Sequence, residues 1–103
     1  MRAIRLSITF NNQFNELLDF GEVNFGSLVA EHKKRAVYDA IEHYLGPHPG
    51  TRRPDLILGL RRYPVSDTPF VLLYDFDDVE VRVHFIVHEK ASLDDLDPTS
   101  AAW

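Results

Sequence analysis

Apolar and polar residues alternate along the first part of the chain, between Ile4 and Phe10. Every second position of this segment is apolar: Ile4, Leu6, Ile8 and Phe10. Alternate side chains of a strand point to opposite faces of a sheet. This period of two therefore predicts a strand with one buried face.

The spacing then changes to one that is typical of a helix. The apolar residues occupy positions i, i+3, i+4, i+7 and i+11: Phe14, Leu17, Leu18, Gly21 and Phe25. Such spacing places them on one helix face. We expect Asn11 or Asn12 to cap the start of this helix and Gly26 to end it.

A second helix is expected to begin with Ser27 as its cap. Its apolar face has these members: Ala30, Val37, Ile41, and Tyr44 or Leu45. Gly46 and Pro47 end it, because neither residue continues a helix well. The join between the two helices is only a couple of residues, so we predict an antiparallel helical hairpin.

Three more strands are predicted after a loop rich in proline and glycine, residues 46–54. Their ranges are Leu56–Val65, Phe70–Phe76 and Val79–Val87. The second is nearly continuously apolar, as expected of a central strand. The third alternates, and its apolar positions are expected to share one face: Val79, Val81, Val83, Phe85 and Val87.

These elements give the order β-α-α-β-β-β and predict an α+β fold. The economical arrangement packs the helical hairpin on one face of an antiparallel sheet and leaves the polar positions of the other face open. A chain of 103 residues has room for one domain, residues 1–103. Residues 90–103 are acidic and contain Pro98, so we expect an irregular tail.

Composition narrows the possible functions. Sixteen Asp and Glu residues outnumber 11 Lys and Arg, and the net charge of −5 disfavours direct nucleic-acid binding. The absence of cysteine excludes disulfides, thiol nucleophiles and cysteine zinc sites. Neither a signal peptide nor a membrane span is evident, and the chain fits a reducing, cytoplasmic environment.

Several basic residues are expected to share the open face of the sheet: Arg61, Arg62, Arg82, His84 and His88. One hypothesis is an RNA-cutting site, in which arginines hold a phosphate and a histidine transfers a proton. The alternative is a solvated strand face with cross-strand charge pairs. We expect no metal, because His84 and His88 lie about 13 Å apart by strand rise. No cofactor motif is present.

The first helix has more apolar residues than one face needs, among them Phe14, Leu18 and Phe20. Scattered exposed apolar residues are ordinary, whereas a contiguous set would form a docking surface. Trp103 is either a frayed end or an anchor in that surface.

Three pieces of the sequence occur together in a characteristic order. They are Gly59–Arg62 (GLRR), a hairpin from Val71 to Val87 with aspartates at its tip, and Val87–Lys90 (VHEK). In this order and at this length they resemble the RelE/ParE superfamily of toxins from type II toxin–antitoxin systems. The resemblance extends from about Ile4 to Pro98, and the acidic charge balance favours the ParE-like branch of the superfamily.

The resemblance implies a bacterial toxin that is held inactive by a ParD-like antitoxin in a hetero-oligomer. A largely disordered antitoxin segment would fold onto the toxin as a helix along an apolar groove. The target implied is DNA gyrase, which a non-enzymatic inhibitor binds through a complementary surface.

Two other functions remain open. One is a ribosome-dependent mRNA endonuclease of the RelE type, whose candidate catalytic residues are Arg61, Arg82 and His88. The other is a relative that has lost toxicity and survives as a binding module. The acidic charge balance favours the gyrase inhibitor.

Overall fold

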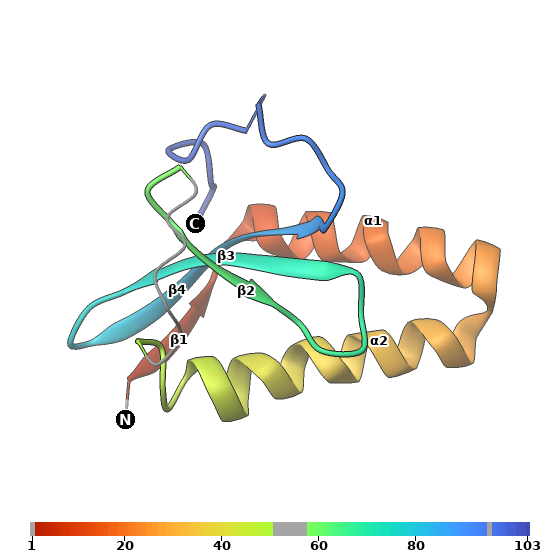
Figure 1. The fold of residues 1–103 in the computed structure, drawn as a ribbon, viewed down its shortest axis with the longest axis horizontal. Coiled ribbons are helices and arrows are strands. Elements are labelled where there is room, and N and C mark those ends of the chain that lie inside the picture. The colour runs from red at the N-terminus through yellow and green to blue at the C-terminus, as the bar shows by residue number, and fades with distance from the viewer. Residues whose placement is uncertain (1, 51–57, 95) are drawn as a thin grey trace.

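A four-stranded sheet carries a helical hairpin on one face (Figure 1). This computed structural model describes residues 2–50, 58–94 and 96–103. In chain order the elements are β1 (Ala3–Leu6), α1 (Ile8–Phe25), α2 (Ser27–Ala40), the π-helical turn η1 (Ile41–Leu45), β2 (Arg61–Pro64), β3 (Phe70–Phe76) and β4 (Glu80–His88). The predicted α+β class and element order are confirmed.

The strands are arranged in the order β1-β4-β3-β2. The predicted antiparallel pairing is confirmed for β2 with β3 and for β3 with β4. The first strand differs, because β1 pairs with β4 in parallel, with Ile4 opposite Val81. A short turn between two strands requires antiparallel pairing, whereas a long connection allows parallel pairing. The two strands are joined through the helices and the other strands, so parallel pairing is possible. The sheet is therefore mixed.

The predicted strand Ile4–Phe10 is too long. The strand ends at Leu6, and Ser7 caps α1: its Oγ accepts the Phe10 N–H at 2.8 Å and donates to the His84 carbonyl at 2.6 Å. Asn11 and Asn12 consequently lie inside the helix. Ile8 and Phe10 fit a strand pattern, but Phe10 also lies four residues before Phe14 on a helix face.

Gly26 ends α1 as predicted. Its φ of 92° suits a residue without a Cβ, and its N–H donates to the Glu22 carbonyl at 3.0 Å. Gly26 also takes the N-cap position of α2, so the prediction that Ser27 is the cap is wrong. The helical segment ends at Leu45, just before Gly46, as predicted.

The predicted strand Leu56–Val65 is shorter in the structure. Its first two residues lie outside the described residues, and Leu58 and Gly59 form a turn with positive φ values of 58° and 78°. The ladder of β2 begins only at Arg61. The Phe70–Phe76 strand has the predicted bounds, and β4 is displaced by one residue from Val79–Val87.

A β-bulge in β4 divides the apolar positions that were expected to share one face. Leu73 pairs with Phe85 and the next residue, Tyr74, pairs with Val83, so His84 is an extra residue in β4. Val81 and Val83 consequently pack toward the helices, whereas Phe85 packs on the opposite face.

The protein thus has a core on each face of the sheet. The larger core lies under the hairpin and includes Phe10, Phe14 and Val37. The smaller has four buried members: Leu60, Val71, Leu73 and Phe85. Residues of the C-terminal segment, Leu93, Leu96 and Ala101, cover it.

The sequence pattern suggested that the second face of the sheet is open. This prediction is wrong, because the C-terminal segment covers that face. The segment that covers it has no helix or strand among its described residues, in keeping with the predicted irregular tail (Figure 1). Separately, no helix in the described ranges is long and apolar enough to cross a membrane.

Candidate partner- and target-binding surfaces

Arg82 lies at the centre of a cluster of carboxylates. Its guanidinium donates to Asp75 and Asp77 at 2.8 Å and to Glu80 at 3.0 Å. These bonds raise the pKa of Arg82 above its usual value. The hydrogen bond from Arg82, helped by the Glu80 and Val79 N–H groups, lowers the pKa of Asp77 to about 2. The arginine is thus neutralised by its own neighbours.

His84 belongs to a second cluster, which holds the end of the chain. Its Nε2 lies 3.1 Å from Asp75 Oδ1, at ion-pair distance but outside hydrogen-bond geometry. Its ring meets the Trp103 ring edge-to-face at 4.8 Å, and the Arg5 guanidinium lies 5.0 Å from the centre of that ring. Trp103 therefore packs as an anchor of its own chain.

Arg61 and Arg62 lie on opposite faces of β2. Arg61 stacks over Phe76, 5.0 Å from the ring centre, on the helix side of the sheet. Arg62 lies on the side of the C-terminal segment, in a small hollow with Leu93 and His88. The two arginines therefore do not form one basic surface.

His88 lies at the exposed end of β4, where its Nδ1 accepts the Lys90 N–H at 3.1 Å. It pairs with Phe70, whereas Arg82 pairs with Asp75. Five strand positions correspond to roughly 16 Å. The structure thus separates the histidine and the arginine that the endonuclease hypothesis requires together.

The apolar candidates on α1 divide between core and surface. Phe14 is only 2% exposed and packs against Phe10 and Phe70, so it is not part of a docking surface. Leu18 is half-buried, and Phe20 is 65% exposed. Phe10, four residues before Phe14, shares that buried face.

An exposed apolar surface surrounds the turn between the helices. We call residues 20–29 the hairpin tip; its exposed large apolar members are Phe20, Val23, Phe25, Leu28 and Val29. The turn between the helices projects past the end of the sheet (Figure 1), and Phe20 and Phe25 share a small hollow with Phe70 and His88 at that end. Of these five residues, Phe20 is the one that was predicted from the sequence as a binding residue, and the apolar face of α2 was expected to point inward.

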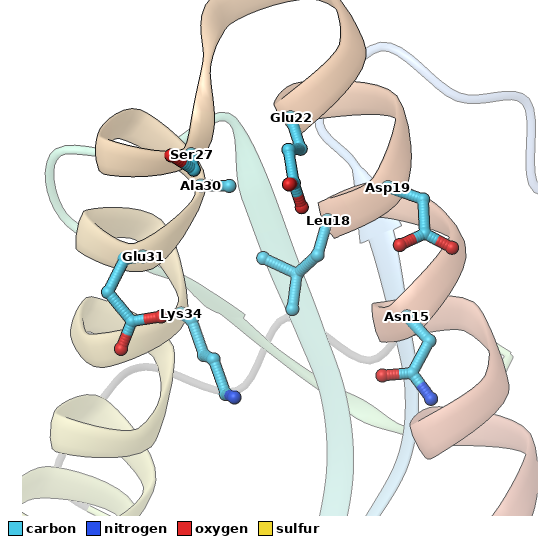
Figure 2. A pocket seen from close by; sticks show the side chains of 8 residues that line it. All are labelled: Asn15, Leu18, Asp19, Glu22, Ser27, Ala30, Glu31 and Lys34. Carbon is cyan, nitrogen blue, oxygen red and sulfur yellow. The ribbon is translucent and has the colours of Figure 1, made fainter.

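A groove of about 420 Å³ runs between α1 and α2, next to the hairpin tip. Its lining consists of Asn15, Leu18, Asp19, Glu22, Ser27, Ala30, Glu31 and Lys34. Figure 2 shows the Leu18 side chain and the Glu22 carboxylate in the space between the two helices. The lining is mostly polar: Leu18 and Ala30 are its apolar residues, and three of its six polar residues are acidic.

The fold is of the RelE/ParE-like class: α+β, in the order β-α-α-β-β-β. A similar solved structure is described as the chromosomal ParDE TA system from P. aeruginosa. The match has a TM-score of 0.72 and covers 85% of this chain and 96% of that one. The identity of 16% limits what is shown to the fold. Neither a family model nor a curated protein matches the sequence.

Proposed function

We propose that this protein is the toxin of a type II toxin–antitoxin system. The observation that carries the proposal is the similarity of fold, over most of the chain, to a chain of the ParDE system. The hairpin tip is a second support, because five large apolar residues stay exposed within ten positions of the chain, and such clusters of exposed apolar residues are typical of a protein–protein contact. The proposed partner is a ParD-like antitoxin, and the complex in which it holds the toxin inactive is a hetero-oligomer.

The proposed target is DNA gyrase in the bacterial cytoplasm. An mRNA endonuclease needs free positive charge for phosphates and a positioned acid–base group. Here three carboxylates engage Arg82, and His88 lies roughly 16 Å away along the sheet. A gyrase inhibitor needs only a complementary surface, and this supports a mode of action through binding.

Regulated expression in bacteria tests the toxin proposal. Induction of the chain alone is expected to arrest growth, and co-expression of the product of an adjacent small reading frame is expected to restore it. Normal growth with abundant folded chain would contradict the proposal.

Stabilisation by the antitoxin is a prediction that follows from binding to the folded state only. A partner present at a thousandfold excess over Kd adds about 4 kcal/mol to the free energy of unfolding. Differential scanning fluorimetry with the purified pair should therefore give a large rise in Tm. An unchanged Tm at saturating antitoxin would exclude this partner.

A further inference from the structure

We infer that a small hollow at the end of the sheet binds the last residue of a partner polypeptide, one with an aliphatic side chain and a free carboxylate. The hollow is separate from the groove between α1 and α2, because the two share no lining residue among those described. This site goes beyond the proposed function and does not depend on it.

The walls of the hollow are mostly apolar. Its lining residues come from both helices and from the adjoining ends of β3 and β4: Leu17, Phe20, Gly21, Phe25, Lys33, Pro69, Phe70 and His88. The hollow has a volume of about 70 Å³. One water molecule needs roughly 10–15 Å³ on this measure, so there is room for about five groups of that size. A single aliphatic residue therefore fits.

The space is open because residue 21 has no side chain. Gly21 is buried in the middle of α1. A Cβ built there would meet no heavy atom of the described residues within 4 Å, its chain neighbours and helix backbone aside. Glycine inside a helix is less favourable than alanine, which would fit here without a clash. Gly21 thus leaves an unfilled volume beside the aromatic rings.

The hollow is locally positive, although acidic residues outnumber basic ones in the chain. Among the described residues, no carboxylate lines it. The Lys33 ammonium lies 5.1 Å from the centre of the Phe25 ring and 5.9 Å from that of Phe70, and none of the described ion pairs involves it. The rings attract the ammonium but have no net charge. An anion in the hollow can therefore neutralise Lys33.

His88 adds a hydrogen-bond donor to the same hollow. Its Nδ1 accepts the Lys90 N–H at 3.1 Å, so the neutral ring carries its proton on Nε2. None of the described hydrogen bonds uses this Nε2–H. A carboxylate in the hollow thus has both an ammonium and an N–H as partners, and hydrogen bonds to a charged group are the stronger kind.

The combination of apolar walls and two donors selects the chemistry of the ligand. A phosphate would lose its hydration against the apolar walls, and an uncharged side chain would leave Lys33 unpaired. The last residue of a polypeptide carries an aliphatic side chain and a carboxylate on one Cα, which matches both features. Phe20 and Phe25 are 65% and 61% exposed, so their rings offer further surface to the preceding residues. That surface favours a polypeptide over a free acid.

NMR titration of the purified full-length protein tests this site. The probe is a short glycine–serine peptide that ends in leucine and valine with a free carboxylate. The comparison ligands are the same peptide with a C-terminal amide, and N-acetylvaline. We expect the free-acid peptide to bind at least about tenfold more tightly than either, because only it has both the carboxylate and the preceding residues. The amides of Gly21 and Phe70 should shift.

Matched variants separate the hollow from net charge and from folding. Lys33→Met should weaken binding of the free-acid peptide by about tenfold or more. Arg35→Met removes the same charge at an exposed position of α2 outside the hollow and should have little effect. Gly21→Leu should fill the hollow and abolish binding while the Tm stays equal or rises, because the side chain enters empty space on a helix.

Equal binding of the acid and the amide, or equal losses in the Lys33 and Arg35 variants, would overturn the inference. N-acetylvaline that binds as tightly as the peptide would show a site for free carboxylic acids and refute a polypeptide ligand. Undiminished binding to a folded Gly21→Leu variant would place the ligand elsewhere. Growth arrest is a separate measurement, so failure of the hollow to bind leaves the proposed function intact.

Discussion

At the scale of single residues, Arg82 shows how neighbours decide the role of a basic side chain. Its position on a strand is compatible with phosphate binding, but Asp75, Asp77 and Glu80 surround it. Bonds of this charge-assisted kind are shorter and stronger than neutral ones. The sequence contains all four residues, but the cross-strand register that brings Asp75 to Arg82 is visible only in the folded sheet.

The lowered pKa of Asp77 predicts how acid affects stability. A carboxyl whose folded-state pKa is depressed from 3.8 to about 2 contributes stability above the higher value and loses it as pH falls through the lower one. Asp77→Asn should therefore flatten the loss of stability between pH 4 and 2, measured by urea unfolding. Asp78→Asn is the control, because none of the described ion pairs involves Asp78. Parallel pH profiles for wild type and Asp77→Asn would contradict the assignment.

Gly21, in the middle of α1, is predicted to be replaceable. A Cβ built at this position has no heavy atom of the described residues within 4 Å outside its own helix backbone. Gly21→Ala should stabilise the protein by about 0.5–1 kcal/mol, because alanine loses less backbone entropy in a helix. Gly46→Ala should destabilise it, since its Cβ would lie 3.1 Å from the Glu42 carbonyl oxygen and 3.3 Å from that of Ile41, and these backbone atoms are less able to move than a side chain. Chemical denaturation of both variants measures the changes in the free energy of unfolding. Destabilisation by Gly21→Ala would contradict the prediction and show a clash at this position.

At the scale of elements, a pattern that extends over several residues predicts that an element is present better than it predicts where the element begins or ends. The Phe70–Phe76 strand was predicted with its observed bounds because an almost unbroken apolar run is buried on both faces. The boundary between β1 and α1 was not predicted correctly, because Ile8 and Phe10 fit both the strand period and the helix period. The cap at Ser7 decides in favour of the helix. The bulge at His84 leaves no mark on the alternating pattern, since it changes only the register with β3.

The C-terminal segment acts as a covering element for the second core. The Ala102 carbonyl accepts the Ile8 N–H at 2.6 Å, and Trp103 packs on His84. Trp103→Ala should lower the free energy of unfolding by about 1–2 kcal/mol, through loss of the ring contacts with His84 and Arg5. Urea unfolding followed by circular dichroism measures it.

Tyr44→Ala provides the control for that experiment, because Tyr44 is 60% exposed. An exposed substitution of this kind should change stability by no more than about 0.5 kcal/mol. Equal effects of the two substitutions would show that the end of the chain does not stabilise the fold.

At the scale of the whole molecule, the predicted site residues divide among separate surfaces. Leu18 and Phe20 lie on the hairpin, Arg82, His84 and Trp103 lie on the face covered by the tail, and Phe14 lies in the core. The helical period identifies the hairpin but not which apolar residues stay exposed, because this depends on how far the helices extend past the sheet. The bulge and the cross-strand ion pairs account for the dispersal of the basic residues.

Gyrase supercoiling measured with the purified chain tests the central claim most directly. We predict that the chain inhibits supercoiling, that it leaves mRNA on programmed ribosomes intact, and that His88→Ala and Arg82→Ala variants that remain folded still inhibit gyrase. Cleavage of the mRNA that either substitution abolishes, with supercoiling unaffected, would contradict the account and establish an endonuclease.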